Sequence, residues 1–290
     1  MMANVVFVTH PERPDAVALA GRVGSWLREQ GHEVRAGEGH AQALTPDVAA
    51  EHDIDLAVSF GGDGTMLRAV EQASPAGVPV LGVNLGQLGY LTEVEPAGLQ
   101  AALERFLVGD YGVEERMTLQ VALDCASSAE DAGDHRPPPT RSLLALNEMV
   151  VEKPVPPGHS IRLAASIADR PFITYAADGI LVATPTGSTA YNLSARGPIV
   201  SPHLRALIVT PVSPHMLFDR PLILEPSETF RLELLSGGPA VLVVDGSCVE
   251  HLEPGDAVEC RAGPHPARLV TFGRRDFHSI LKAKFNLTDR

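Results

Sequence analysis

The sequence predicts a buried strand that leads directly into a helix within the segment Asp55-Leu56-Ala57-Val58-Ser59-Phe60-Gly61-Gly62-Asp63-Gly64-Thr65-Met66-Leu67-Arg68. Leu56 to Phe60 is a short apolar run bounded by turn residues, as expected for a strand of a covered sheet. Met66, Val70 and Ala73 then recur at helical spacing. The glycine turn therefore ends at a helix N-terminus, where unpaired backbone N–H groups and the helix dipole favour an anion.

This glycine turn also contains a carboxylate. Gly61, Gly62 and Gly64 let the backbone approach a phosphate closely, whereas the charge of Asp63 opposes phosphate binding. Asp63 could instead accept a proton from a substrate hydroxyl, or it could help to hold Mg²⁺. The structural alternative is that Asp63 makes an Asx turn and Thr65 caps the helix.

Composition restricts the class of protein. A chain of 290 residues predicts two domains, and 44% hydrophobic residues without an apolar stretch of spanning length predict a soluble globular protein with no membrane partner. The start, Met1-Met2-Ala3-Asn4-Val5, shows no secretory signal. Cys125, Cys248 and Cys260 have no CxxC spacing, which favours a reducing cytoplasm without structural zinc.

The charge of the chain argues against some functions. A formal charge of −13 is unfavourable for nonspecific binding of nucleic acid, which needs a basic surface. A phosphorylated ligand would have to be met by local groups. Because no lysine stands in a GxxxxGK[ST] pattern, phosphoryl transfer by the P-loop route is excluded.

Strands and helices alternate through residues 1–112. Strand-like runs at Val5–Thr9 and Val78–Asn84 and a helical stripe at Leu99–Leu107 are typical of a doubly wound parallel sheet, whose ligands bind beyond the carboxyl ends of the strands. A second glycine segment, Gly82-x-Asn84-x-Gly86-x-x-Gly89, lies at such an end. Its spacing differs from the GxGxxG fingerprint, which makes a nicotinamide dehydrogenase a poorer interpretation.

Residues 113–272 are predicted to form a second, mostly antiparallel β domain. Met117, Leu119, Val121 and Leu123 alternate with polar positions, and more short strands with turn signals follow. Residues 125–140 are polar and turn-rich, and we interpret them as a mobile hairpin loop. A helix is expected within 277–287, with residues 273–290 packing back on the first domain.

Two segments of the second domain predict ligand contacts. Asp178 to Ser194 is expected to form a turn, a strand and a hydroxyl-rich loop that opens a short helix. Its hydroxyls and Tyr191 suit a nucleoside base and ribose, although a helix cap rich in Thr and Ser is an equal alternative. Asn147 and Glu148 lie within the predicted apolar strand Leu143 to Val151, where a buried carboxylate is costly unless it has a partner, such as a ligand hydroxyl.

These motifs together resemble the NAD kinase family. The matches are Gly-Gly-Asp-Gly-Thr at 61–65, Asn-Glu at 147–148, and Asp-Gly at 178–179 followed by Thr-Pro-Thr-Gly-Ser-Thr-Ala-Tyr-Asn-Leu-Ser at 184–194. Supporting matches are Gly-Val-Asn-Leu-Gly-Gln-Leu-Gly-Tyr-Leu at 82–91 and Pro-His-Met-Leu-Phe-Asp-Arg-Pro-Leu at 214–222. The order and spacing agree across nearly the whole chain, which makes the combination very specific.

The resemblance implies phosphorylation of the adenosine ribose 2′-hydroxyl of NAD to give NADP. The donor would be ATP or another compound such as polyphosphate, and Mg²⁺ or another divalent metal would be required. Members of the family have the same arrangement of an α/β domain and a β domain. They assemble as homodimers or homotetramers, in which a neighbouring subunit completes the site.

The family's functional residues carry over to matching positions of this chain. Asp63 would accept the 2′-hydroxyl proton, Asp178 would recognise the nicotinamide end, and residues 189–194 would hold the adenosine. The expected NAD-binding residues are Asp63, Gly64, Arg68, Asn147, Glu148, His159, Asp178, Thr189, Ala190, Tyr191, Asn192, Leu193, Ser194 and Ser213. The donor phosphates would lie along Gly61, Gly62, Gly64 and Thr65.

Some positions depart from the family pattern or match it loosely. Many members have Gln after the late Asp-Gly pair, where this chain has the shorter Ser247. His159 falls roughly where some members have a substrate-facing His, and a solvated loop residue is the alternative. Ser213 aligns with a pocket position, and Ala176 with a variable position that bears on the choice between NAD and NADH. No cluster of His, Asp and Glu assigns the metal ligands.

Two other functions are considered. Lipid kinases of the diacylglycerol or sphingosine type share a Gly-Gly-Asp-Gly-Thr loop, but their later motif lacks Thr-Pro-Thr-Gly-Ser-Thr-Ala-Tyr, and this chain has no membrane-binding segment. A noncatalytic NAD(P)-binding sensor could keep the pocket. Asp63 argues against the sensor, because binding alone does not need a carboxylate beside the phosphates.

Overall fold

The structure is a computed structural model that describes residues 2–10, 12–36, 44–86, 89–124, 141–154, 160–273 and 276–287. The chain divides into two compact units, one made of Met1–Arg116 and His265–Arg290 and the other of Met117–Pro264. The predicted hairpin loop at 125–140 and His159 lie outside the described residues.

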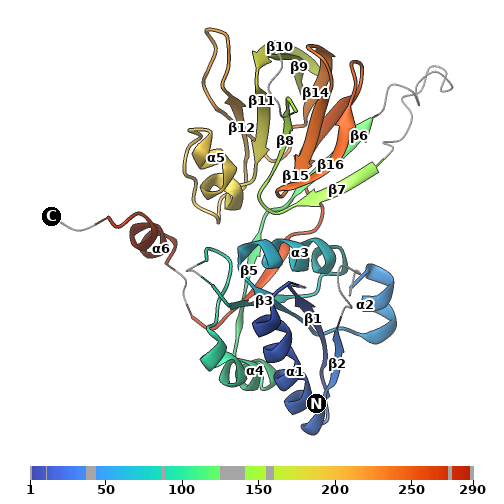
Figure 1. The fold of residues 1–290 in the computed structure, drawn as a ribbon, viewed down its shortest axis with the longest axis vertical. Coiled ribbons are helices and arrows are strands. Elements are labelled where there is room, and N and C mark those ends of the chain that lie inside the picture. Colours follow the sequence, from blue (N-terminus) through green and yellow to red (C-terminus); the bar gives the residue numbers. More distant parts are fainter. Residues whose placement is uncertain are drawn as a thin grey trace. The chain divides into compact units, whose positions relative to one another are not determined.

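The first unit is built on a six-stranded sheet with strand order β2-β1-β3-β4-β18-β5 (Figure 1). Its strands are β1 (Asn4–Thr9), β2 (Glu33–Ala36), β3 (Leu56–Gly61), β4 (Val80–Asn84), β5 (Gly112–Arg116) and β18 (Ala267–Thr271). Its helices are α1 (Pro14–Glu29), α2 (Pro46–His52), α3 (Asp63–Ala73), α4 (Leu99–Leu107) and α6 (Phe277–Lys284). All neighbours pair in parallel except the edge strand β5, which confirms the predicted doubly wound sheet.

Hydrophobic patterning explains why this sheet is covered. All six residues of β3 are buried, and α1 turns Leu19, Val23 and Leu27 into the same core as Phe7 on β1. The central strand β3 is therefore buried along its whole length. A single residue, Gly62, connects its carboxyl end to α3.

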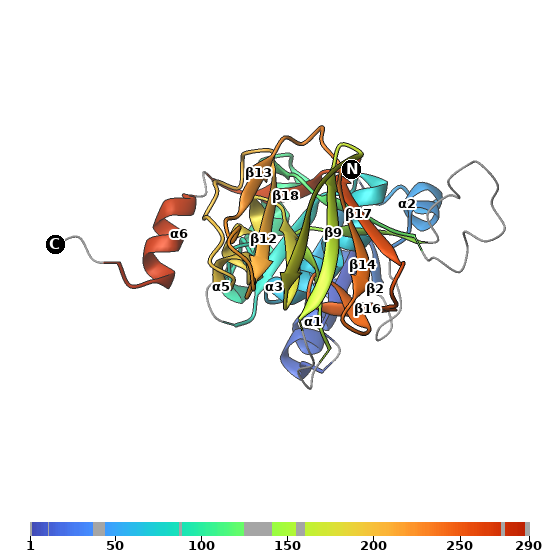
Figure 2. The ribbon, with the colours of Figure 1, turned by 90° about the horizontal axis from the view of Figure 1, so that it is seen from above.

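The second unit contains two antiparallel sheets with orders β10-β9-β14-β17-β6-β7 and β13-β12-β11-β8-β15-β16. The first sheet comprises β6 (Leu119–Asp124), β7 (Arg141–Ala145), β9 (Ile161–Ile167), β10 (Arg170–Ala177), β14 (Phe230–Ser236) and β17 (Ala257–Ala262), and Figure 2 shows β9 beside β14. The second comprises β8 (Glu148–Glu152), β11 (Gly179–Ala183), β12 (Leu207–Val212), β13 (Leu222–Leu224), β15 (Ala240–Val244) and β16 (Ser247–Leu252), and the short helix α5 (Tyr191–Ser194) follows β11.

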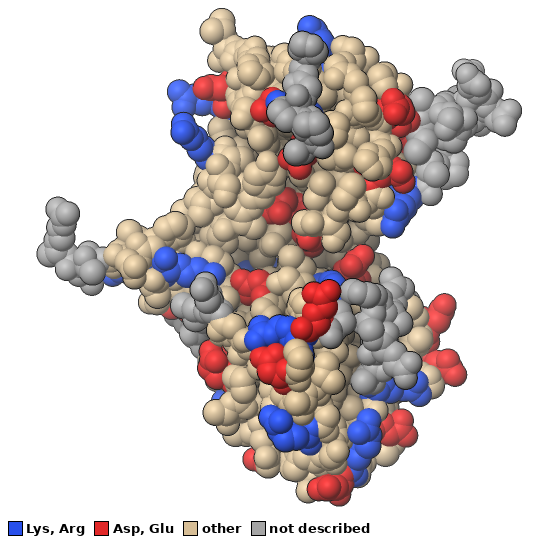
Figure 3. Space-filling model, viewed as in Figure 1, with Lys and Arg blue, Asp and Glu red and all other residues tan. Residues whose placement is uncertain are grey.

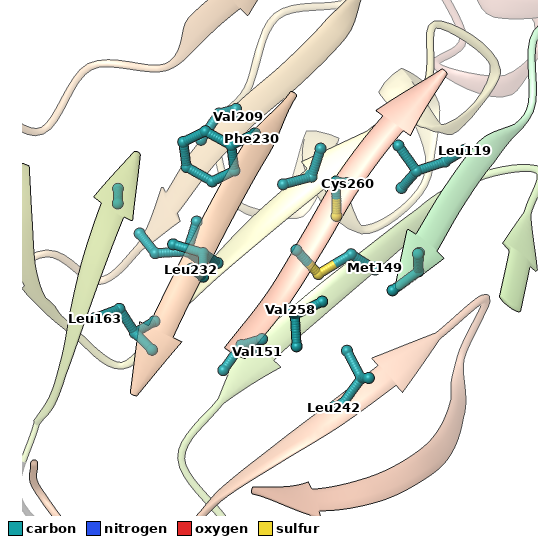
Figure 4. Packing of buried hydrophobic residues seen from close by; sticks show 14 of the residues in the cluster. Leu119, Met149, Val151, Leu163, Val209, Phe230, Leu232, Leu242, Val258 and Cys260 are labelled. Atoms are coloured by element: carbon teal, nitrogen blue, oxygen red, sulfur yellow. The ribbon is translucent and has the colours of Figure 1, made fainter. Parts of the chain in front are cut away.

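One hydrophobic core joins these two sheets. Met149 and Leu242 from one sheet and Leu163, Leu232 and Cys260 from the other belong to the same buried cluster (Figure 4). The predicted antiparallel β domain is therefore a packed pair of sheets.

Two predicted boundaries differ from the structure. The sequence predicts a second domain at 113–272, whereas β5 and β18 belong to the sheet of the first unit, so the second unit comprises Met117–Pro264. The predicted single strand from Leu143 to Val151 is divided into β7 and β8, which belong to different sheets. The chain bends between them because Leu146, Asn147 and Glu148 donate their backbone N–H groups to one carboxylate, that of Asp245.

Acidic and basic side chains are intermixed on the face shown in Figure 3. Within the described residues, no helix is long and apolar enough to cross a membrane.

Candidate active site

The glycine turn forms the junction of β3 and α3 in the first unit. Gly62 is the N-cap of α3, and the helix begins at Asp63, so Thr65 is not the cap. A Cβ on Gly61 would meet the Thr65 hydroxyl at 2.1 Å, whereas Gly62 and Gly64 face open space. Gly61 is therefore required for packing, and Gly62 and Gly64 leave room beside the helix N-terminus for an anionic ligand.

The carboxylate of Asp63 is held from a distant part of the chain. The backbone N–H of Tyr90 donates to its Oδ2 at 2.9 Å, and that of Leu91 donates to its Oδ1 at 3.1 Å. These long-range partners replace the Asx turn that we considered. One donor on each oxygen fixes the plane of the carboxylate and leaves further lone pairs that can accept another hydrogen bond.

The second glycine segment makes this arrangement possible. A Cβ on Gly89 would lie 2.4 Å from Asp63 Oδ1 and 2.7 Å from the hydroxyl oxygen of Thr92. Only glycine therefore lets the Tyr90 backbone reach the carboxylate. The two glycine segments, both predicted to lie at strand ends, follow the paired strands β3 and β4 and meet at Asp63.

Two other predicted site residues lie on α3 near this junction. Arg68 is half-buried on α3, and Gly64 is exposed. Burial, followed by the nearby charge of Asp63, raises the pKa of Tyr90. Neither Tyr90 nor Gly89 is among the site residues predicted from the sequence, although both stand within the quoted family match.

The second unit contains a different kind of carboxylate, Glu148, at the start of β8. Only 8% of Glu148 is exposed, and its Oε2 has no hydrogen-bond partner among the described residues. Burial and then the charge of Asp245 raise the pKa of Glu148 to about 8, against a hydrogen bond from the Tyr191 backbone. At neutral pH its protonated form can therefore donate one hydrogen bond and accept another.

Asp245 holds the bend that presents Asn147 and Glu148. Its oxygens accept the N–H groups of Leu146 and Asn147 at 2.8 Å each and of Glu148 at 3.1 Å. Burial raises the pKa of Asp245, while these three donors lower it. The late Asp-Gly pair is the sequence feature that could have identified Asp245. In the structure this pair forms the turn before β16, and Asp245 has a φ of 46° there.

The hydroxyl-rich segment packs directly against this bend. Thr184 donates its hydroxyl to the Leu146 carbonyl and its backbone N–H to the Asn147 carbonyl. A Cβ on Gly187 would lie 2.1 Å from that same Asn147 oxygen. The predicted loop and the predicted Asn-Glu pair are therefore brought together, as the interpretation of both as ligand contacts requires.

The predicted adenosine-binding residues have different environments. Thr189, Ala190, Tyr191 and Leu193 are half-buried, and Ser194 is exposed. Asn192 is fully buried, and its side chain bonds to the Ser188 and Pro198 carbonyls and to the Thr210 hydroxyl. This placement supports a role for Asn192 in holding the segment rather than in touching a ligand.

Tyr191 is linked to β8. Its hydroxyl donates to Glu152 at 3.2 Å. Burial, with the charge of Glu152 next in importance, raises the pKa of Tyr191 to about 12. The phenol therefore keeps its proton throughout the physiological range and acts as a donor.

Asp178 lies beside a lysine and a histidine. Lys153 Nζ is 2.7 Å from its Oδ1, and Nε2 of the exposed His215 is 3.6 Å from the same oxygen. Ala176 accepts the backbone N–H of His215 at 2.7 Å, which brings this variable position next to the histidine. Ser213 is exposed with a φ of 45°. Lys153 and His215 were not identified from the sequence.

The sequence matches known families along almost its entire length. Residues 5–111 match the family model described as the ATP-NAD kinase N-terminal domain, and residues 146–272 match the one described as the ATP-NAD kinase C-terminal domain. A protein named NAD kinase from Heliobacterium modesticaldum is 42% identical over 289 residues, which cover 98% of each chain. Another from Syntrophotalea carbinolica is 38% identical over 285 residues, which cover 96% of each chain.

Solved structures agree with these matches. The crystal structure of yeast NADH kinase complexed with NADH is similar with a TM-score of 0.83 and 26% identity, covering 100% of this chain and 89% of that one. An NAD kinase from Archaeoglobus fulgidus in complex with ATP gives a TM-score of 0.68 and 26% identity, covering 99% and 97%. Because both family models and near full-length relatives match in order along the sequence, the chain belongs to the NAD kinase family.

Proposed function

We propose that this NAD kinase transfers the terminal phosphoryl group of ATP to the adenosine ribose 2′-hydroxyl of NAD, with Asp63 accepting the hydroxyl proton. The ribose oxygen forms a bond to the γ-phosphorus, the bond from that phosphorus to the β,γ-bridging oxygen breaks, and ADP leaves with that oxygen. The observation that carries the role of Asp63 is its fixed carboxylate at the N-terminus of α3. The relatives solved with NADH and with ATP support the two substrates.

The geometry of Asp63 suits a proton acceptor that acts during phosphoryl transfer. A ribose hydroxyl is far less acidic than a carboxyl group, so the proton moves as the bond to phosphorus forms. A positioned base of this kind contributes about 10²- to 10⁴-fold. The open space beside Gly62 and Gly64 supports the placement of donor phosphates at the helix N-terminus, although Gly61 and Thr65 pack on each other.

The second unit would bind the dinucleotide. A protonated Glu148, whose Oε2 lacks a partner among the described residues, matches a ribose hydroxyl or a base amine. Asn147 would act beside it, and the half-buried Tyr191 would support the adenosine. Asp178, fixed by Lys153, would recognise the nicotinamide end.

Three further parts of the proposal rest on the family resemblance. Within the described residues, no group of three or more His, Cys, Asp or Glu could hold a metal ion, and both oxygens of Asp63 already accept N–H groups. The described residues therefore assign no ligands to the divalent metal, and we assign no step to it. A homodimer or homotetramer and a cytoplasmic location remain predictions, the latter supported by the free thiols of Cys248 and Cys260.

The direct test is NADP formation from NAD, ATP and Mg²⁺ by the wild type, Asp63→Asn and Asp55→Asn, read with an NADP-specific dehydrogenase. Asp55 precedes β3 at its other end and accepts the Asn4 N–H at 2.8 Å, which makes it a matched control. We expect loss of about 10²- to 10⁴-fold in kcat for Asp63→Asn alone. Wild-type kcat in Asp63→Asn would contradict the base, and NAD binding by the wild type without turnover would favour the sensor.

A further inference from the structure

Within the first unit, the C-terminal helix α6 contacts Tyr90, one of the two residues whose backbone N–H groups hold Asp63. The Phe277 ring lies 6.4 Å from the Tyr90 ring, centroid to centroid, and Lys284 Nζ lies 4.2 Å from the Tyr90 centroid. Phe277 and Lys284 are the first and last residues of the helix, so α6 contacts Tyr90 through both of its ends. Figure 1 shows α6 apart from the helices α1 to α4 of the same unit.

The sequence of α6 favours this docking. Asp276 caps the helix by accepting the His278 N–H, and Phe277, Ile280 and Leu281 are half-buried, while no described residue of the helix is fully buried. A helix of eight residues is marginal by itself in water, so its order depends on the contacts that it makes. The aromatic pair and the cation over the ring are such contacts.

Tyr90 connects these contacts to the carboxylate. Its ring faces α6, and its backbone N–H donates to Asp63 Oδ2, while the next N–H, that of the buried Leu91, donates to Oδ1. Gly89 directly before Tyr90 has no Cβ to fix its backbone. The ring of Tyr90 is therefore the side chain through which the orientation of these N–H groups can be set.

We infer that Tyr90 is a positioning residue for Asp63. The helix α6 fixes the Tyr90 ring through Phe277 and Lys284. The inference rests on the proposed role of Asp63. It assigns to the C-terminal helix a catalytic effect at a distance, exerted through backbone N–H groups and without contact with either substrate. A small displacement of a reacting group can lower a rate by about 10²-fold.

The test measures kcat and KM for NAD and ATP in Tyr90→Ala, Tyr90→Phe, Phe277→Ala and Lys284→Gln of the full chain. We expect Tyr90→Ala to lower kcat by about 10- to 100-fold with both KM values unchanged. Tyr90→Phe keeps the ring and should restore kcat. Lys284→Gln should lower kcat by about 2- to 5-fold, the factor that corresponds to the free energy of one exposed cation–π contact. Phe285→Ala, one residue beyond α6 and exposed, is the matched control.

Each variant is also made in the Asp63→Asn background. If Tyr90 acts through Asp63, Tyr90→Ala adds no further loss there. An equal loss in both backgrounds, a change confined to KM, or wild-type kcat in Tyr90→Ala would overturn the inference. Wild-type kcat in Asp63→Asn alone would instead remove the proposed base, which separates the two failures. If Tyr90→Ala does not fold, Phe277→Ala and Lys284→Gln decide the question by the same criteria.

Discussion

Each of the two units contains one carboxylate to which we assign a role in the proposed function, and the two are held in opposite ways. Asp63 is half-buried, and each of its oxygens accepts a backbone N–H. Glu148 is buried beside Asp245, and one of its oxygens has no partner among the described residues. The first arrangement suits a group that must accept a proton in one orientation, and the second suits a group that waits for a ligand to complete its hydrogen bonds.

The two side chains are both carboxylates, so burial and the supply of hydrogen-bond donors, more than residue type, distinguish their proposed roles. Backbone N–H groups from a neighbouring strand end fix Asp63. In the second unit three backbone N–H groups donate to Asp245. Glu148 therefore has fewer hydrogen bonds to offset the cost of burying its carboxyl group.

The largest effect is expected for the pH dependence of stability in Glu148→Gln. The native pKa of about 8 is raised from 4.5, so the folded protein keeps a proton that the unfolded chain loses. Stability from this group is complete below about 4.5 and falls by about 1.4 kcal/mol per pH unit as pH rises towards 8. Glu148→Gln should remove that loss in urea unfolding at several pH values.

Glu233→Gln on β14 controls for the removal of one negative charge from the same unit. If the wild type and Glu148→Gln lose stability in parallel from pH 5 to pH 8, Glu148 is not the buried acid described here.

Next in size is Gly89→Ala. Its Cβ would lie 2.4 Å from Asp63 Oδ1, so the carboxylate or the loop must shift, and kcat should fall by about 10²-fold. Gly86→Ala in the same segment is the control, because its Cβ would meet only Arg13 at 3.7 Å. The two variants are compared by their steady-state rates of NADP formation. Similar kcat values for both would contradict the proposed effect of this loop on Asp63.

A moderate effect is expected in the second unit for Gly187→Ala. The added methyl group would overlap the Asn147 carbonyl at 2.1 Å, which should cost about 1–3 kcal/mol of unfolding free energy. Gly21→Ala on α1 meets nothing within 4 Å and should stabilise the protein by about 0.4–1 kcal/mol. Chemical denaturation measures both, and an unchanged midpoint for Gly187→Ala would mean that the bend is looser than its packing indicates.

The smallest effect is expected for Lys153→Gln. The ion pair with Asp178 is partly exposed, so its loss should weaken NAD binding by at most about 1 kcal/mol, and less at high salt. Calorimetric titration with NAD in low and high salt makes the comparison. A loss that persists undiminished at high salt would point to direct contact between Lys153 and NAD.

Local patterns could be predicted from the sequence, and long-range hydrogen bonds could not. The run from Leu56 to Phe60 and the helix after it follow from periodicity, and the structure confirms them as β3 and α3. The donor to Asp63 stands 27 residues away at Tyr90, and no local pattern links the two.

Long-range contacts also explain why the strand at 143–151 and the domain boundary near β18 were predicted wrongly. Leu143 to Val151 is continuously apolar apart from Asn147 and Glu148, so it resembles one strand, and the carboxylate that bends it lies 97 to 99 residues away. The strand β18 follows the antiparallel strands of the second unit in the sequence, and only its pairing with β4 and β5 assigns it to the first unit.

The most direct test of the contrast measures the single-turnover rate of NADP formation and the Kd for NAD in Asp63→Asn and Glu148→Ala. We predict that Asp63→Asn loses about 10²- to 10⁴-fold in rate and keeps its affinity for NAD, whereas Glu148→Ala loses affinity and keeps its rate at saturating NAD. If Asp63→Asn weakens NAD binding without slowing the bound complex, or Glu148→Ala slows the chemistry at saturation, the division between a catalytic and a binding carboxylate is wrong.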